Sequence, residues 1–362
     1  MAVYKFNDVF EDATKKGKKI PTNQYLLEGK YPIIDQGKED IGGYTNTEDG
    51  LFTNVPAIIF GDHTRIIKYV DMPFFIGADG VKILEKKVAE ADYKYLFYTL
   101  NHAYIPDTGY NRHFKFLKEI SITIPDIVEQ RKIVQQLDLL SSMIDKQLSI
   151  LEIYDNLVKS RFIEIFGDPV INDKGWPKDK LKNHADVIVG YPFASSQYTA
   201  DGLPIVGGYN LMQGFVQWEN SKFWPSPEGY EQYLLKDKDI VIAMDRPWVG
   251  SGFKIAIIEK ADLPAILIQR TACIRCKDIP TQFLYRLLDS AWFADHCQIT
   301  GSLVPHISNK DILNYEIIVP PLDLQNQFAD FVALTDKSKL AVQQSIETLQ
   351  TLKANLMQEY FG

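Results

Sequence analysis

The chain contains an internal repeat at a fixed spacing, and this repeat constrains the fold more than any other feature of the sequence. One copy runs from Ile122 to Gly167, and the other runs from Ile317 to Gly362. Each copy has a proline soon after its start and a Phe-Gly pair at its end, and every landmark is displaced by the same 195 positions (122 to 317, 167 to 362). A repeat in unbroken register indicates a duplicated structural unit.

Apolar residues recur inside the first copy with a mean step of about 3.56 residues, which is typical of one face of a helix. Pro125 and Asp126 favour a helix start, and Gly167 favours its end. The apolar positions are Ile133, Leu137, Leu140, Ile144, Leu148, Leu151, Tyr154, Val158, Phe162 and Ile165. The second copy repeats this pattern more loosely. Two narrow stripes in one chain can bury each other, so we predict an antiparallel two-helix coiled coil. The alternative is that each helix packs onto its own globular domain as a core element.

The two segments outside the repeat also resemble each other. Each has short β-branched runs bounded by Gly and Asp turns, and each has a short apolar helical pattern near its end, at 95–100 and 283–288. We therefore predict an α+β fold, in which two similar mixed α/β domains are separated by the coiled coil, with a pseudo-two-fold internal repeat. The predicted boundaries are 1–121 and 168–316 for the globular domains, and 122–167 and 317–362 for the helices.

The charge distribution limits the way this chain can hold nucleic acid. The net charge is −8. Residues 1–121 carry 16 basic and 17 acidic side chains, and residues 168–316 carry 15 and 18. Neither segment has the basic excess of a protein that binds DNA by bulk electrostatics, so any DNA contact requires local patches and help from partners.

The sequence also predicts a cytoplasmic protein with no catalytic motif of its own. No apolar run approaches the ~18 residues of a membrane span, and three cysteines fit a reducing compartment. There is no nucleotide-binding Gly-rich loop and no His-Glu-x-x-His motif. Cys273 and Cys276 are expected to be buried on a strand rather than to bind zinc, because positions three apart on a strand point to opposite faces. We therefore predict no metal and no catalytic residue.

Polar loops with aromatic neighbours occur at matching places in the two globular segments. Arginine, asparagine and lysine pair with base edges or hold phosphates, although a solvated loop is an equally good interpretation of any single residue. The candidate DNA-binding residues of the first segment are His63, Arg65, Asn111, Arg112, His113 and Lys115. Those of the second segment are Tyr209, Asn210, Arg246, Trp248, His306, Ser308, Asn309 and Lys310.

The alternating layout and the motifs that open the long helices resemble the specificity subunit of type I restriction–modification systems. These motifs are Ile-Thr-Ile-Pro-Asp-Ile-Val-Glu-Gln from residue 122 and Val-Pro-Pro-Leu-Asp-Leu-Gln from residue 319. The family's Pro-Pro-Leu-Glu-Glu-Gln signature is kept in part, since Pro125-Asp126 replaces the first Pro-Pro and Leu324 replaces a glutamate. The resemblance covers the whole chain and makes the globular segments target-recognition domains and the helices spacers between them.

The resemblance implies a non-catalytic subunit that reads a bipartite asymmetric DNA sequence, one half per recognition domain. Its implied partners are double-stranded DNA, two methyltransferase subunits and the restriction/translocase subunits. S-adenosylmethionine, ATP and Mg would belong to those partners, so no cofactor is expected in this chain. Two rival hypotheses remain: an enzyme with an unrecognised active site, and a two-headed coiled-coil scaffold that binds proteins or glycans without DNA.

Overall fold

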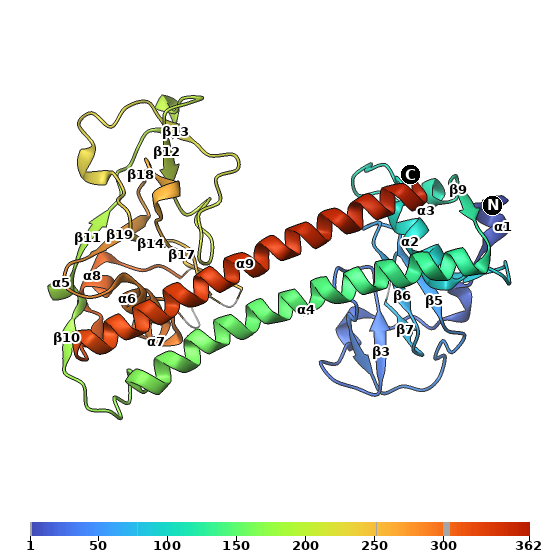
Figure 1. Ribbon diagram of the computed structural model, residues 1–362, viewed down its shortest axis with the longest axis horizontal. Coiled ribbons are helices and arrows are strands. Elements are labelled where there is room, and N and C mark those ends of the chain that lie inside the picture. The colour runs from blue at the N-terminus through green and yellow to red at the C-terminus, as the bar shows by residue number, and fades with distance from the viewer. Residues whose placement is uncertain (1, 78, 251, 300–304) are drawn as a thin grey trace. The chain divides into compact units, whose positions relative to one another are not determined.

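The computed structural model describes residues 2–77, 79–250, 252–299 and 305–362. Two helices of 40 residues each, α4 (Ile127–Phe166) and α9 (Leu322–Phe361), are by far its longest described elements, drawn in green and red in Figure 1. Their first and last residues differ by the 195 positions of the sequence repeat. Asp126 caps α4, because its Oδ1 accepts hydrogen bonds from the backbone N–H groups of Val128 and Glu129, each at 3.0 Å.

The chain divides into two compact units, and each contains a piece of both long helices. The first unit comprises residues 1–150 and 342–362, and the second comprises residues 151–341. The predicted helix ranges 122–167 and 317–362 begin five residues before α4 and α9, because residues 121–124 and 316–318 form short strands ahead of the helices. The predicted division into domains stays a prediction. Each unit is described by itself below.

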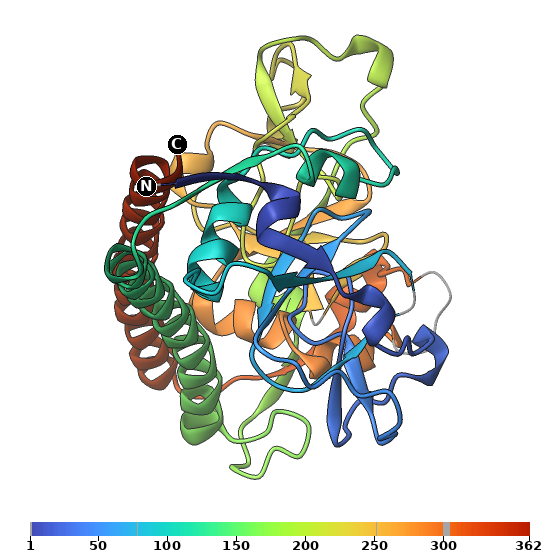
Figure 2. The same cartoon turned by 90° about the vertical axis from the view of Figure 1, so that its right-hand side faces the viewer.

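The α4 and α9 segments contact each other in both units, and they lie side by side in Figures 1 and 2. In the first unit, Lys353 Nζ donates to Ser141 Oγ at 2.8 Å, and the hydroxyl of Tyr360 donates to Gln136 Oε1 at 2.6 Å. In the second unit, Lys339 pairs with Asp155 at 2.6 Å, and the rings of Phe162 and Phe328 lie 5.4 Å apart. Partners pair in reverse order along the two helices, so the predicted antiparallel arrangement is confirmed.

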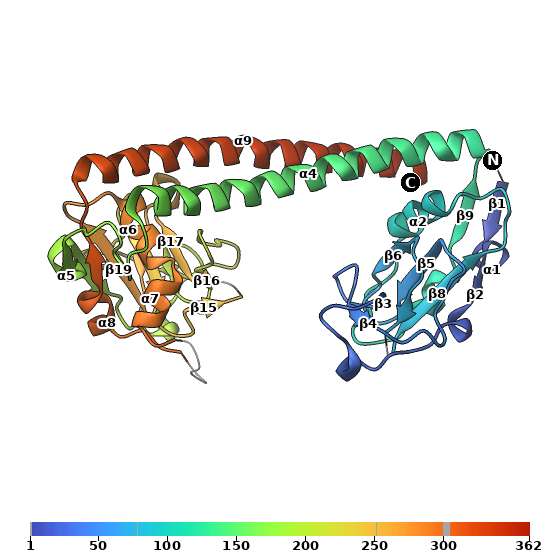
Figure 3. The same cartoon turned by 90° about the horizontal axis from the view of Figure 1, so that it is seen from below.

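The first unit is built on three small sheets. Strand β1 (Ala2–Lys5) pairs antiparallel with β9 (Ser121–Ile124), as Figure 3 shows. An antiparallel sheet has the order β2-β8-β5-β6, and a second sheet has the order β4-β3-β7 with β3 and β7 parallel. Their bounds are β2 (Phe10–Asp12), β3 (Tyr31–Ile34), β4 (Gly43–Thr45), β5 (Ala57–Gly61), β6 (Ile67–Val70), β7 (Phe75–Ile76) and β8 (Val81–Lys86).

The second unit repeats this topology strand for strand. Strand β10 pairs with β20, the four-stranded antiparallel sheet has the order β11-β19-β14-β17, and the three-stranded sheet has the order β13-β12-β18 with β12 and β18 parallel. Their bounds are β10 (Lys178–Lys180), β11 (Ala185–Val189), β12 (Leu203–Val206), β13 (Phe223–Trp224), β14 (Ile240–Ala243), β17 (Ile255–Ile257), β18 (Ile266–Leu267), β19 (Thr271–Cys276) and β20 (Glu316–Ile318). A hairpin of β15 (Trp248–Val249) and β16 (Gly252–Phe253) is added after β14. The shared strand order confirms the predicted α+β fold with an internal repeat.

A short helix joins the four-stranded sheet of each unit to the long helices. In the first unit this helix is α2 (Tyr93–His102), whose Tyr95 ring lies 5.3 Å from that of Phe361 at the end of α9. In the second unit it is α6 (Thr281–Leu288), whose Phe283 ring lies 4.9 Å from that of Phe166 at the end of α4. The ends of the long helices are therefore core elements of the units, while the helices also pair with each other. Both interpretations of the sequence pattern are correct in part.

The remaining described helices are short. They are α1 (Phe6–Val9), α3 (Phe114–Leu117), α5 (Leu181–His184), α7 (Ala291–His296) and α8 (Asn309–Asn314), together with the single-turn 3-10 segments η1 to η5. None of the helices in the described part of the chain is long and apolar enough to cross a membrane.

Candidate nucleic-acid interface

In the first unit, the loop after β5 meets the loop that leads to α3. The guanidinium of Arg65 donates through Nη2 to Asp107 Oδ2 at 2.7 Å and through Nη1 to the carbonyl of Ile105 at 3.3 Å. The ring of His63 stacks on the highly exposed ring of Tyr110, with centroids 4.8 Å apart and planes 8° from parallel. The amide of Gly109 and the Arg65 guanidinium lower the pKa of the Asp107 carboxyl. The structure therefore brings two predicted residues, His63 and Arg65, into one polar surface.

His113 lies beneath this surface rather than on it. Its side chain is completely buried, its Nδ1 lies 3.0 Å from the carbonyl oxygen of Asp62, and its Nε2 lies 3.3 Å from Thr108 Oγ1. Asp62 is itself buried and accepts the backbone N–H of Phe114 at 2.7 Å. Because both ring nitrogens face protein groups, His113 supports the loop, and this position does not favour the predicted DNA contact.

The other predicted residues of the first unit are exposed. Asn111 donates from its side-chain amide to the carbonyl of Thr108, so it also holds the loop. Arg112 is exposed, and Lys115 lies over the ring of Phe116 at 4.8 Å. Arg112 and Lys115 can reach a ligand without breaking a described ion pair.

In the second unit, the loop after β14 meets the segment before α8. Asp245 joins them, because its Oδ1 lies 2.5 Å from Nδ1 of His306 and its Oδ2 lies 3.1 Å from Nε of Arg270. The backbone N–H of Arg246 donates to the carbonyl of Pro305 at 3.1 Å, and the Arg246 side chain is exposed. The structure therefore brings together Arg246 and His306, which lie 60 positions apart in the sequence (246 to 306).

The Tyr209-Asn210 turn divides into one exposed and one buried residue. Asn210 is 2% exposed, accepts the backbone N–H of Gly207 at 2.9 Å and donates to the carbonyl of Ile205 at 3.0 Å. It therefore stabilises the turn, and its predicted DNA contact is not favoured by this position. Tyr209 is exposed on one side, and Lys222 Nζ lies 4.9 Å from its ring centre.

The remaining predicted residues of the second unit serve different local roles. Trp248 is half-buried against Phe253 and donates from Nε1 to the carbonyl of Gly250 at 3.0 Å. Ser308 caps α8, since its Oγ accepts the backbone N–H of Asp311 at 3.2 Å. Asn309 is half-buried, and Lys310 is exposed.

Sequence reasoning missed two residues of these surfaces. Tyr110 directly precedes the candidate residues Asn111 and Arg112, and an aromatic residue beside polar ones was the available signal. Arg270 lies in the turn between β18 and β19, and no local pattern relates it to Asp245, from which it is 25 positions away (245 to 270).

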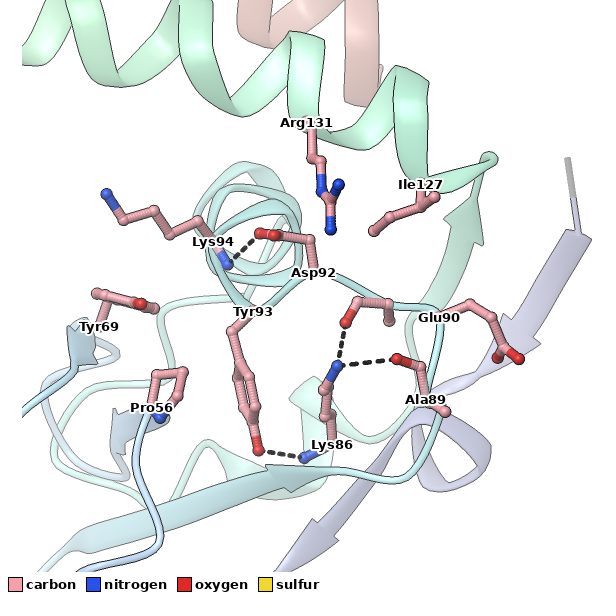
Figure 4. Close-up of a pocket in the computed structure, with 11 residues that line it drawn as sticks. Pro56, Tyr69, Lys86, Ala89, Glu90, Asp92, Tyr93, Lys94, Ile127 and Arg131 are labelled. Atoms are coloured by element: carbon pink, nitrogen blue, oxygen red, sulfur yellow. Dashed lines mark hydrogen bonds between the residues drawn. The ribbon is translucent and has the colours of Figure 1, made fainter.

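The first unit also has a pocket of about 390 Å³ at the start of α4, shown in Figure 4. Two of the cationic side chains that line this pocket, Lys86 and Lys94, already have partners within the protein. Lys86 Nζ donates to the carbonyls of Ala89 and Ala91, and Lys94 Nζ pairs with Asp138 at 2.5 Å.

Among the described residues there is no group of three or more His, Cys, Asp or Glu side chains that could hold a metal ion. Cys273 is buried on β19, as the sequence predicted, whereas Cys276, which was also expected to be buried, is half-buried. Burial raises the pKa of both thiols.

Comparisons with known proteins agree on one family. The model of the type I restriction modification DNA specificity domain matches residues 1–152 and 173–351. The type I restriction enzyme MjaVIII specificity subunit of Methanocaldococcus jannaschii is 28% identical over an alignment 377 positions long, gaps included, that covers 91% of this chain and 88% of that protein.

Two solved structures share the fold. The S subunit of a type I restriction–modification system from M. genitalium aligns with a TM-score of 0.59 at 18% identity, covering 100% of this chain and 96% of that one. A chain from a study of complex assembly and conformational transition of the type I R-M system aligns with a TM-score of 0.55 at 17% identity, covering 99% and 97%. The chain therefore belongs to the DNA specificity subunits of type I restriction–modification systems, which recognise a DNA sequence and are not themselves catalytic.

Proposed function

We propose that this subunit reads a bipartite asymmetric DNA sequence, with one half-site bound by each recognition domain. The observation that carries this proposal is the repeated strand order of the two units combined with different side chains in the loops after β5 and β14. A common framework with two different reading surfaces recognises two different half-sites. The long helices α4 and α9, which contribute to both units, would set the length of the non-specific gap between the two half-sites.

The candidate DNA contacts in this proposal are the exposed members of the predicted set. Arginine and lysine there would contact bases or phosphates, and His113 and Asn210 would hold their loops in place. Because the chain as a whole is acidic, partner subunits would supply the additional phosphate contacts.

We further propose that the specificity subunit holds two methyltransferase subunits and then the restriction/translocase subunits. Helix α4 has exposed apolar side chains in each unit: Leu139 at 61% and Met143 at 40% in the first, and Ile153 at 62% and Leu157 at 44% in the second. Residues four positions apart lie on one helix face, so each pair forms a short apolar stripe that a partner can cover. Methylation, ATP hydrolysis and cleavage, with their cofactors, would reside in those partners in the cytoplasm.

The proposal is tested on the chain co-expressed with its methyltransferase. We expect co-purification, and salt-dependent binding of one bipartite duplex with a fixed gap. Deleting matched whole turns from α4 and α9 should change the gap and leave both half-site sequences unchanged. If the bases that are read change instead, the helices are not the spacer. Binding to a protein or glycan without any DNA binding would favour the scaffold hypothesis.

The docking stripe is tested separately by the double substitution Ile153→Lys and Leu157→Lys. If the methyltransferase covers this stripe, two lysines would be buried in the interface and would abolish its co-purification. The thermal unfolding of the free chain should stay unchanged. Glu152→Lys adds a positive charge to a different face of the same helix turn and serves as the matched control. Equal co-purification of the double variant and the control would show that the partner binds elsewhere.

A further inference from the structure

Three arginines adopt the left-handed backbone conformation, and all three lie in the candidate interface loops. They are Arg65 with φ 64°, Arg246 with φ 47° and Arg270 with φ 65°. Positive φ is uncommon for residues with a long side chain, and it persists where the surrounding structure holds it, often at functional sites. Arg270 is the one of these three that the sequence did not single out.

Arg270 connects its own turn to two other chain segments. Its Nε pairs with Asp245 Oδ2 at 3.1 Å, and the other oxygen of that carboxylate binds His306 Nδ1 at 2.5 Å. Its backbone carbonyl accepts the N–H of Met244 at 2.8 Å, and the carbonyl of Met244 accepts the N–H of Ile307 at 2.8 Å. The end of β14, the turn before β19 and the segment before α8 are thereby fixed around one guanidinium.

The guanidinium groups of Arg270 and Arg65 differ in which nitrogens remain available to a ligand. Both terminal nitrogens of Arg65 donate hydrogen bonds to groups of the protein itself, and its side chain is 34% exposed. Arg270 uses Nε, and its side chain is 73% exposed. In the described part of the chain, the two terminal nitrogens of Arg270 have no hydrogen-bond partner. A guanidinium held at Nε presents these nitrogens as a rigid planar fork.

We propose that Arg270 reads a guanine in the half-site of the second recognition domain, through its two terminal nitrogens. This fork matches the O6 and N7 acceptors of guanine in the major groove, the commonest specific arginine–base contact. Asp245 and His306 are positioning residues, because they orient the guanidinium without contacting the base. The inference rests on the proposed function and adds one base identity to it.

The test compares variants of the chain co-purified with its methyltransferase, using duplexes in which each base pair of both half-sites is varied in turn. For Arg270→Ala, and for Arg270→Lys, which keeps the charge but not the fork, we expect discrimination at one G·C pair of the second half-site to fall about 10- to 100-fold. Discrimination in the first half-site should be unchanged. Lys260→Ala, an exposed cation of the same unit with no described partner, is the control and should change neither half-site.

The positioning role is tested with Asp245→Asn, which preserves side-chain shape but not charge. It should weaken discrimination at the same base pair, and Asp245→Glu should restore part of it. Equal weakening on all sequences, with unchanged discrimination, would assign Arg270 to a phosphate and overturn the proposal, as would no effect at all. If the unmodified complex shows no sequence preference, the proposed function itself has failed.

Discussion

The two recognition domains have the same strand order but build their interface loops in different ways. In the first, a buried carboxylate, Asp62, fixes the backbone before α3, and Arg65 pairs with Asp107. In the second, a half-exposed carboxylate, Asp245, holds Arg270 and His306 at the surface. The framework is thus duplicated while the side chains proposed to face DNA differ. Fold and specificity can therefore change independently in this architecture.

The long helices show the same contrast at equivalent positions. Gln130 in α4 and Gln325 in α9 are related by the repeat, and both are buried. Gln130 accepts the backbone N–H of Asp92 at 2.7 Å and donates to the carbonyls of Glu90 and Pro125. Gln325 donates to the carbonyl of Pro320 at 2.7 Å, and no hydrogen bond to its Oε1 is described. The same residue type therefore makes different sets of described hydrogen bonds in the two copies.

The largest effect is expected where the helices enter the cores. Phe162 is fully buried against Phe166, Phe283 and Phe328, whereas its repeat equivalent, Met357, is half-buried. Phe162→Ala should lower the free energy of unfolding of the second unit by about 3–5 kcal/mol, because it leaves a large cavity. Met357→Ala should have a smaller effect on the first unit. Urea unfolding of both variants measures the difference, and equal losses would contradict the packing described.

Removing the two interface carboxylates should separate stability from recognition. Asp62→Ala deletes a buried charge-assisted hydrogen bond to Phe114 and should cost about 1.5–3 kcal/mol. Asp245→Ala deletes partly exposed ion pairs and should cost about 0–1 kcal/mol. Thermal unfolding gives both values. A larger loss for Asp245→Ala than for Asp62→Ala would reverse the comparison between the domains.

The glutamine pair gives a smaller difference. Gln130→Ala leaves the Asp92 N–H without its partner and should cost about 1–3 kcal/mol. Gln325→Ala should cost about 0.5–1.5 kcal/mol, because it removes a single described hydrogen bond. Chemical denaturation of each variant beside the unmodified chain tests this. Indistinguishable costs would mean that the Gln130 contacts add nothing to stability.

The smallest expected effect is a pH dependence confined to the second unit. Burial raises the pKa of the Asp289 carboxyl, despite the opposing influence of Arg286. A raised pKa in the folded state means that this group favours folding at low pH, and that its contribution is lost as the pH rises through the folded-state pKa. Asp289→Asn should therefore stabilise the second unit at neutral pH and flatten its stability between acidic and neutral pH. An unchanged pH profile would assign the dependence to other groups.

Much of the architecture could be predicted from local sequence signals. The bounds of α4 and α9, the strands around Ile58 and Val241, and the helices α2 and α6 follow from hydrophobic periodicity and from Pro, Asp and Gly at element ends. These signals are short-range, so a single sequence contains them. The duplication added long-range information, because it required the two halves to share one topology.

The exposure of loop side chains could not be predicted in this way. Asn111 and His113 are two positions apart in one polar motif, yet the first is exposed and the second is completely buried. His113 is held by Asp62, which lies 51 positions earlier and whose backbone carbonyl oxygen is 3.0 Å from the Nδ1 of His113. No period or propensity encodes a contact of that separation.

The sequence by itself determined the repeat, the presence and ends of the two long helices, the mixed α/β class of both domains and the resemblance to specificity subunits. Tertiary structure alone decided which polar residues face solvent and which support a loop, and it joined Arg270 to Asp245 and His306 from three separate segments. The physical reason is that backbone elements follow from local propensity and periodicity. A binding surface depends on side chains that meet only after distant segments have packed.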